Sequence, residues 1–478
     1  MLAAMRASGN VTPRGVGSPR PTLPIMLQEL AAAVRDHAVT PLELVDEAVR
    51  RIEASDGDIN AVVRLEADAA REIAALHDRT GALAGIPVLV KDMARCRGSV
   101  TTYGSRLFVD ADPDDVDDVV VARLRAAGAI VIGRTNTPAF GHAPFTSNLV
   151  FGATRNPWNP ECSPGGSSGG SAAALAAGFV PIATTSDGGG SVRIPAALCG
   201  LVGLKPTTGS VGRNVLPRWI ELSTQGVTAS TVADVVLQVE VIAGAASGDW
   251  LSALPAIGQF TPTRPTRVRA CRTFRADVDP VVEAAYEASL EAIAADGIPV
   301  ERVESPSDAQ SIIDWFFISS CELAHSLAGE RDRWESLDAS LQDILRFGIG
   351  VSMEDYLAAT RRRHDLGARI DDTLGGDSVL ALPTLNVQDW GPEGPVASDA
   401  GAVTGDPSIA ANTPDINLTG HPAVSVPMGL GDRGVPMGLQ LVAPRWADGL
   451  ALGVAELLEH VRPWPLVATG YHPFPTGT

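Results

Sequence analysis

Lysine is almost missing from this sequence of 478 residues. Lysine and arginine together number 37, but only Lys91 and Lys205 are lysines, which leaves 35 arginines. A surface position accepts either residue, so the shortage by itself is typical of a coding bias toward arginine. A site that needs a neutral amine cannot use arginine, because the guanidinium keeps its proton at every accessible pH. Each of the two lysines is therefore a candidate for such a site.

Other features are also scarce, and each shortage argues against a class of protein. The five cysteines form no C-x-x-C pair and the eight histidines show no H-x-x-x-H or H-E-x-x-H spacing, so we expect reduced thiols and no metal site. A formal charge of −19 disfavours nucleic acid or an anionic membrane as a partner, since both bind basic surfaces. The sequence contains no run of about 20 apolar residues, which is the length needed to span a bilayer. These properties together favour a cytoplasmic protein.

The chain is expected to form one domain behind a short leader. Residues 1–24 contain glycine, proline and arginine but no apolar run long enough for the core of a signal peptide, which predicts a flexible segment. From residue 25 onward, helical spacing of apolar residues alternates with short apolar runs typical of buried strands, which favours an α/β layered fold. Helices are expected at 40–52, 66–76, 116–127, 171–177, 232–245 and within 308–372, and strands at 85–92, 129–133, 179–184, 266–270 and 378–383, with a hairpin over 423–442.

Two tracts rich in glycine and serine carry the chemistry, SPGGSSGGSAAA at 163–174 and TSDGGGSVRIP at 185–195. A flexible linker usually has this composition, but a linker has no place between a strand and a helix inside a core. Glycines let successive backbone amides converge on one oxygen, which is what an oxyanion hole beside a nucleophile requires. A phosphate-binding loop is disfavoured because neither tract contains G-K-[ST]. GGSSG at 165–169 also fits a G-x-S-x-G nucleophile elbow, but a segment with three prolines precedes it instead of a strand.

Together with KPT at 205–207, the two tracts resemble the signature region of the amidase signature family. The resemblance extends over most of the chain, through GIPVLVKD at 85–92, GRTNTP at 133–138, GATRNPW at 152–158, NLTGHPA at 417–423 and GLQLV at 438–442. It implies a single-domain α/β/α sandwich around a large mixed, twisted β-sheet. That domain would span residues 25–478, with the core motifs at about 85–210.

The resemblance also implies a catalytic triad. Ser191 matches the nucleophile, Ser167 matches a serine held by a cis peptide bond, and Lys91 matches the general base. A serine hydroxyl is a weak nucleophile until a base takes its proton, and lysine can act as that base only when it is neutral. Burial at the end of an apolar strand would lower the pKa of Lys91, and Ser167 could relay the proton from Ser191 to it.

Further residues match supporting roles in the same family. The amides of Gly188, Gly189 and Gly190, with that of Ser191, are expected to form the oxyanion hole. The supporting residues are Ser168 as a nearby hydroxyl and Asp187 with Arg193 as an ion pair that braces the loop. Lys205, considered apart from the resemblance, is interpreted as a support of the loop rather than a catalytic residue. The sequence departs from the family pattern at Gly188, where threonine is usual, so we expect a more flexible oxyanion loop. The 213–230 stretch departs as well, with Ala229-Ser230 where an arginine is frequent, which points to unusual specificity.

The function implied is hydrolysis of carboxamides through an acyl-enzyme, without a metal or an organic cofactor. Three alternatives use the same machinery: carbamate cleavage by a urethanase-like branch, aryl acylamidase or esterase activity, and a role as the glutaminase subunit of an amidotransferase. The expected partner is a small-molecule amide or carbamate rather than nucleic acid or a membrane, and a homodimer stays open.

Overall fold

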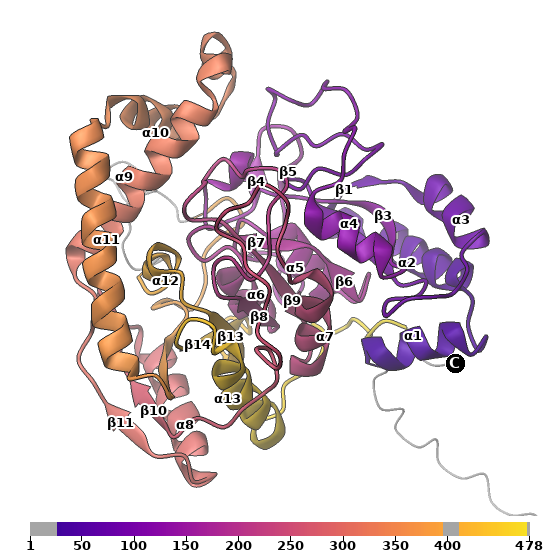
Figure 1. Cartoon of the computed structure of the whole chain (residues 1–478). Helices are drawn as coiled ribbons and strands as arrows, with labels where there is room; N and C mark the ends of the chain where they lie inside the picture. The colour runs from indigo at the N-terminus through magenta and orange to yellow at the C-terminus, as the bar shows by residue number, and fades with distance from the viewer. Residues whose placement is uncertain (1–25, 395–410, 476–478) are drawn as a thin grey trace, which may run out of the picture.

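A large mixed β-sheet with helices on both faces forms the centre of the molecule (Figure 1). The structure is a computed structural model that describes residues 26–394 and 411–475, so the leader predicted at 1–24 lies outside the described residues. The α/β/α sandwich expected from the family resemblance is confirmed. Among the described residues, no helix has both the length and the apolar character needed to cross a bilayer.

Two hydrogen-bonded segments make up the sheet. Four strands pair in the order β1 (Val62–Leu65), β3 (Ile130–Thr135), β2 (Pro87–Lys91) and β6 (Ile182–Ala183). Eight pair in the order β11 (Val300–Arg302), β10 (Arg267–Ala270), β12 (Ser378–Pro383), β14 (Pro436–Val442), β13 (Ala423–Leu430), β8 (Val202–Lys205), β9 (Thr224–Ala229) and β7 (Thr185–Asp187). Only Thr184 separates β6 from β7, so this stretch pairs with β2 on one side and β9 on the other and joins the two segments. A separate hairpin contains β4 (Ser147–Asn148) and β5 (Gly152–Ala153).

A helix forms in each region where the sequence predicts one. The helices are α1 (Leu27–Arg35), α2 (Pro41–Ser55), α3 (Ala67–Ala75), α4 (Val119–Ala126), α5 (Gly169–Ala176), α6 (Arg193–Cys199), α7 (Val232–Ile242), α8 (Pro280–Ala295), α9 (Ala309–Ser326), α10 (Ala339–Gly350), α11 (Met353–Leu374), α12 (Pro414–Thr419) and α13 (Asp448–Val461). Within the described residues, five of these helices, α1, α6, α8, α12 and α13, form where none was predicted. Short 3-10 helices are η1 (Asp56–Asp58), η2 (Ala139–Gly141) and η3 (Ala328–Ser336). Helices α9, α10 and α11 pack together at one side of the molecule, the left in Figure 1.

One predicted strand is shorter than expected. The apolar run at 179–184 predicts a strand of six residues, but β6 contains only Ile182 and Ala183. Pro181 has no backbone N–H to donate to a neighbouring strand, so regular pairing begins after it. Phe179 and Val180 are buried all the same, because their side chains belong to the main apolar core.

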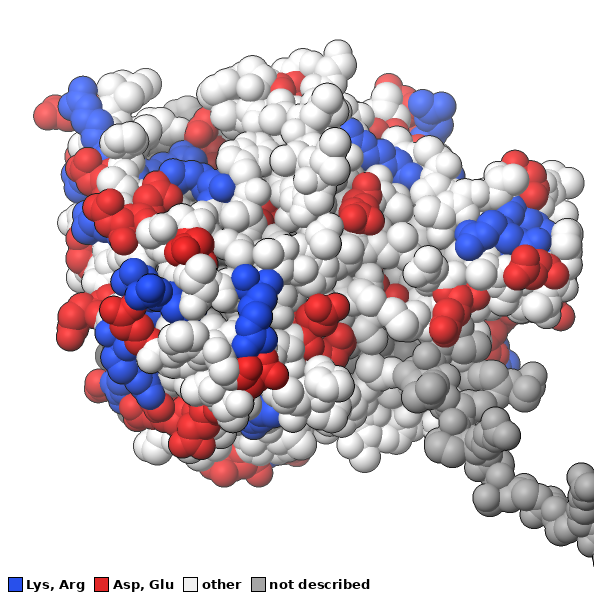
Figure 2. Space-filling model, turned by 60° about the horizontal axis from the view of Figure 1, so that its bottom comes forward, with Lys and Arg blue, Asp and Glu red and all other residues white. Residues whose placement is uncertain are grey.

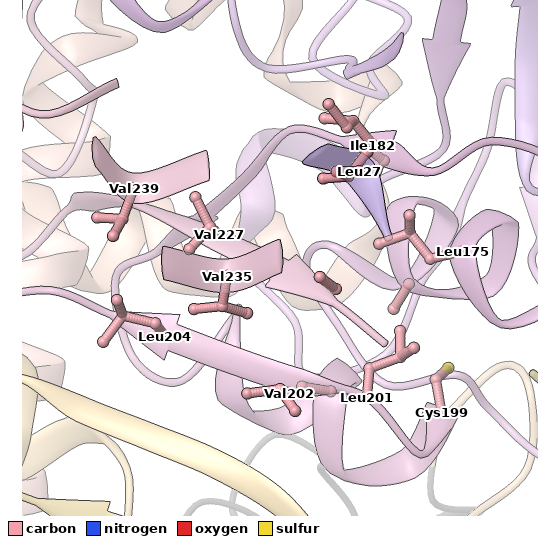
Figure 3. Close-up of a cluster of buried hydrophobic side chains, with 14 of the residues drawn as sticks. Leu27, Leu175, Ile182, Cys199, Leu201, Val202, Leu204, Val227, Val235 and Val239 are labelled. Carbon is pink, nitrogen blue, oxygen red and sulfur yellow. The ribbon is translucent and has the colours of Figure 1, made fainter. Parts of the chain in front are cut away.

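Helix α5 positions the first glycine–serine tract in the interior. All eight of its residues are buried, and all except Leu175 are glycine, alanine or serine, which lets the surrounding backbone approach closely. A Cβ atom on Gly170 would lie 2.5 Å from the backbone nitrogen of Asn136. Figure 3 shows Leu175 of this helix in the same buried apolar region as Leu27 of α1 and Ile182 of β6. The tract is therefore fixed by the core and is not a linker.

The two signs of charge are mixed on the face of the molecule that Figure 2 shows. On the face drawn in Figure 2, arginine side chains lie among aspartate and glutamate side chains. All five cysteines are free thiols, in agreement with the sequence prediction.

Candidate active site

Both glycine–serine tracts contribute to one cavity of about 310 Å³ beside the carboxyl end of β2. Lys91, Ser167 and Ser191 all line it, together with Ser186 and Gly188. The first three come from well-separated parts of the sequence, namely the end of β2, the turn before α5 and the turn between β7 and α6. The fold therefore brings the predicted triad residues to one place.

Lys91 is buried, with 2% of its surface exposed, and its amine is surrounded by serine hydroxyls. The Nζ atom lies 2.8 Å from Oγ of Ser167, 2.9 Å from Oγ of Ser168 and 3.2 Å from Oγ of Ser186. Burial lowers the pKa of Lys91 to about 7, although the negative charge of Asp187 acts in the opposite direction. A substantial fraction of this amine is therefore neutral at neutral pH.

The hydroxyl of Ser168 acts as the acceptor in its contact with Lys91, because its own proton is used elsewhere. Ser168 donates its hydroxyl proton to the carbonyl oxygen of Ser186 at 3.2 Å, so its oxygen accepts from Lys91. A neutral amine has two N–H donors and one lone pair. With Ser168 and Ser186 as acceptors, the lone pair is left for the hydroxyl of Ser167.

The backbone at Ser167 has the form that the family resemblance implies. The peptide bond between Gly166 and Ser167 is cis. A Cβ atom on Gly166 would lie 2.6 Å from the backbone nitrogen and oxygen of Phe145, so only glycine fits against that segment. The N–H of the next residue, Ser168, donates to the carbonyl oxygen of Ser191 at 3.3 Å, which ties the first tract to the second.

The backbone amides of the glycine loop before Ser191 fall into two groups, one bonded within the loop and the others without an acceptor among the described residues. The N–H of Gly190 donates to Oδ1 of Asp187 at 2.7 Å, so this amide is already engaged. The amides of Gly188, Gly189 and Ser191 have no acceptor among the described residues. The expectation that Gly190 donates to an oxyanion is therefore corrected: three of the four amides stay available, and that of Gly190 holds the loop to Asp187.

Asp187 and Arg193 form a fully buried ion pair, as expected. Two N–H groups of Arg193 donate to the carboxylate, each at 2.9 Å, and further donors of the guanidinium reach Gln440 and Asn417, each at 2.6 Å. Burial alone would raise the pKa of Asp187, but the charge and hydrogen bonds of Arg193 outweigh it and hold the pKa well below its ordinary value. The pair is thus ionised and satisfied, and it braces the loop that carries Ser191.

The glycine at position 188 does not leave the loop loosely packed, contrary to the expectation of greater flexibility. A Cβ atom there would lie 2.5 Å from Cε3 of Trp219, and one on Gly189 would lie 2.5 Å from the ring of Trp315. The indole N–H of Trp315 donates to the carbonyl oxygen of Gly188 at 2.9 Å. Two tryptophans therefore occupy the space that larger loop residues would need. They pack edge to face, with ring centroids 5.6 Å apart.

The second lysine lies outside the cavity lining. Lys205 is at the end of β8, and its Nζ donates to the carbonyl oxygen of Pro206 at 3.0 Å. Burial lowers its pKa to about 7, as for Lys91, but none of its hydrogen bonds goes to a serine of the two tracts. Position, rather than pKa, distinguishes the two lysines.

Several residues of the site have no clear signal in the sequence. Ser186 contacts Lys91 and is not among the predicted residues, although its place directly before Asp187 in the tract is a hint. Trp219 and Trp315 come from an irregular loop and from α9, where nothing local marks them as neighbours of the glycines. Arg218 lines the cavity from the same loop as Trp219.

Comparison with known proteins identifies the family of the chain. The amidase family model matches residues 43–452. Relatives include a glutamyl-tRNA(Gln) amidotransferase subunit of Chromohalobacter salexigens, 32% identical over 92% of this chain and 97% of that one, and an acylamidase of Rhodococcus erythropolis, 33% identical over 91% and 95%. The solved structure of a 6-aminohexanoate cyclic dimer hydrolase with its substrate is 29% identical, with a TM-score of 0.85 over 92% of this chain and 97% of that one. The chain therefore belongs to the amidase signature family, whose members hydrolyse carbon–nitrogen bonds of amides.

Proposed function

We propose that this protein hydrolyses carboxamides with Ser191 as nucleophile, Ser167 as proton relay and Lys91 as general base. The observation that carries the proposal is the buried amine of Lys91, 2.8 Å from the hydroxyl of Ser167, in the cavity that Ser191 also lines. No other lysine in the sequence could fill this role, since Lys205 hydrogen-bonds elsewhere.

In the acylation step, neutral Lys91 takes the proton of Ser167 as Ser167 takes that of Ser191. The Oγ atom of Ser191 then attacks the carbonyl carbon of the amide. Negative charge that develops on the carbonyl oxygen is stabilised by the N–H groups of Gly188, Gly189 and Ser191, because fixed donors cost no reorganisation at the moment of reaction. The proton returns through Ser167 to the departing amine, and the acyl group stays on Ser191.

In deacylation, a water molecule replaces the amine at the same position. Its proton passes through Ser167 to Lys91, its oxygen attacks the acyl carbon, and the carboxylic acid leaves as Ser191 recovers its proton. Lys91 and Ser167 supply proton transfer in both steps, and the loop amides supply charge stabilisation. The relatives named an acylamidase and a cyclic dimer hydrolase support an amide as the substrate.

A substrate panel tests this proposal and separates it from its alternatives. Purified wild-type protein is assayed against p-nitroacetanilide, a p-nitrophenyl carbamate, p-nitrophenyl acetate and glutamine. We expect release of p-nitroaniline from the anilide, and its loss by at least about a thousandfold in Ser191→Ala, as for removal of a serine nucleophile. Faster turnover of the carbamate at matched concentration would favour the urethanase alternative, and activity on glutamine alone would favour the amidotransferase role.

Ser336→Ala serves as the matched control, because Ser336 is an exposed serine at the end of η3, outside the cavity lining. If Ser191→Ala hydrolyses the anilide at the wild-type rate, Ser191 is not the nucleophile. Wild-type protein that hydrolyses none of these substrates would count against the proposed function.

A further inference from the structure

Arg218 places a guanidinium in the wall of the catalytic cavity. It belongs to the irregular loop between β8 and β9, which departs from the family pattern, and it lines the cavity with Lys91, Ser167 and Ser191. Its Cζ atom lies 4.7 Å from the ring centroid of Tyr103 and 5.2 Å from those of Phe108 and Phe140. Three aromatic rings therefore hold the guanidinium in one position by cation–π contacts.

No carboxylate neutralises this cation among the described residues. No aspartate or glutamate oxygen there lies within 4.0 Å of Arg218, and the only hydrogen bond of its guanidinium goes from Nη1 to the carbonyl oxygen of Ser326, at 3.2 Å. Its Nε atom is buried and has no hydrogen-bond partner within residues 26–394 and 411–475. Burial lowers the pKa of Arg218, while Tyr103 and Glu330 act weakly in the other direction, but arginine still keeps its proton at neutral pH.

Another arginine of the same loop shows the contrast. Arg213 also lines the cavity, but Asp249 accepts two N–H groups of its guanidinium, at 3.1 and 3.3 Å, as well as its backbone N–H. Arg213 is thus neutralised by the protein and holds the loop in place. Within the part of the chain that the structure describes, Arg218 has donors to spare and a charge without a counter-ion.

A short segment of the cavity wall, Phe140-Gly141, lies beside both Arg218 and Ser167. A Cβ atom on Gly141 would be 3.1 Å from Oγ of Ser167, and Phe140, the preceding residue, stacks on Arg218. The path from the reacting hydroxyl to the guanidinium therefore runs along one short segment of the cavity wall. Asp118 is the carboxylate among the lining residues, and it is not paired with Arg218.

We propose that Arg218 binds an anionic group of the substrate, so that the preferred substrates are amides that carry a carboxylate on their acyl or amine portion. This inference rests on the proposed amidase function. A guanidinium offers two parallel N–H donors that match the geometry of a carboxylate. Among the described residues that line the cavity, the other basic side chains are engaged, since Arg213 is paired with Asp249 and the amine of Lys91 is surrounded by serine hydroxyls.

Pairs of substrates that differ only in charge test the proposal. For the acyl side, the 4-nitroanilide of succinic acid is compared with its methyl ester, and for the amine side N-acetyl-4-aminobenzoate is compared with its methyl ester. We expect wild-type protein to favour the acid in one pair, by roughly 10- to 150-fold in kcat/KM, as for a charge-assisted hydrogen bond. The pair in which the preference occurs identifies the portion of the substrate that meets Arg218.

The preference should disappear in Arg218→Met, which keeps much of the apolar volume but loses the charge, because kcat/KM should fall far more for the acid than for the neutral ester. Arg218→Lys should keep part of it, because the charge stays but the two parallel donors do not. Arg331→Met is the matched control, since Arg331 also stacks on one ring, that of Trp334, but lies exposed and outside the cavity lining.

The outcomes separate this inference from the proposed function. Equal kcat/KM for acid and ester in both pairs would overturn the inference and leave the amidase assignment intact. An equal loss on acid and ester in Arg218→Met, with a lowered Tm, would show that Arg218 only anchors the loop. No hydrolysis of any member by wild-type protein would count against the proposed function itself.

Discussion

A Cβ atom at position 188 would lie 2.5 Å from Cε3 of Trp219, so these two positions share one volume. Gly188→Thr, which restores the residue usual in the family, should therefore overpack the loop and lower the free energy of unfolding by about 1–3 kcal/mol. Trp219→Ala in the same chain should relieve that overlap. Urea unfolding of the two single variants and the double variant measures the coupling, and strictly additive effects would show that the two residues do not compete for space.

The pKa of Lys91 predicts how activity depends on pH. The amine must be neutral to accept a proton, and burial lowers its pKa to about 7. We expect kcat/KM for p-nitroacetanilide to rise as pH increases through about 7 and to level off above it. Lys91→Ala should lose nearly all activity and the pH-dependent rise with it. A residual rate that keeps the same pH midpoint would identify a different base.

Lys205 provides the control for that experiment, because it is equally buried and its pKa is also lowered to about 7. Its amine donates to the carbonyl oxygen of Pro206 and contacts no serine of the tracts. We expect Lys205→Met to keep the pH midpoint of activity within a few tenths of a unit, whatever its effect on Tm. A shifted midpoint would mean that Lys205 contributes to the ionisation measured.

The ion pair of Asp187 and Arg193 predicts a large loss of stability when it is broken. Both side chains are fully buried, so Asp187→Asn leaves the charge of Arg193 without its partner, which typically costs about 3–5 kcal/mol. Since the pair holds the pKa of Asp187 below its ordinary value, its stabilisation is complete above about pH 4 and is lost as pH falls toward the folded-state pKa. The difference in unfolding free energy between wild type and Asp187→Asn, measured from pH 7 down to pH 3, should be constant above about pH 4 and should begin to narrow below it, by about 1 kcal/mol at pH 3. A constant difference across that range would contradict the assignment.

Much of the fold follows from local sequence signals. The helix predicted from residue 40 begins as α2, where Thr40 accepts the N–H of Glu43, and the apolar run before Lys91 becomes the buried strand β2. These predictions succeed because capping joins residues three apart and because an unbroken apolar run is itself the local signal of a buried strand. The 179–184 run fails in part, since one proline removes a donor and shortens the strand.

The site was only partly predictable, for a physical reason. The serines and Lys91 could be found because the family keeps them in recognisable motifs, and their convergence needs only the shared fold. The packing of Trp219 against Gly188 joins segments without a common motif, so no pattern in either one predicts the contact. The engagement of the Gly190 amide by Asp187 depends on backbone orientation within the loop, which composition does not reveal.

Ser168 should position the general base without taking part in bond making. Its hydroxyl proton goes to the carbonyl oxygen of Ser186, so its oxygen accepts an N–H of Lys91 at 2.9 Å and helps to direct the lone pair toward Ser167. This acceptor oxygen stabilises the ammonium form of Lys91 more than the neutral amine, and Ser168→Ala removes it. We therefore expect kcat to fall roughly 10- to 100-fold, as for a lost hydrogen bond to a charged group, while the pH midpoint of kcat/KM shifts below that of wild type. Ser186→Ala, which removes the longer 3.2 Å contact, should show the same signs with smaller changes. A pH midpoint that moves upward in Ser168→Ala would mean that Ser168 donates to the amine instead, and the lone pair of Lys91 would then be directed away from Ser167.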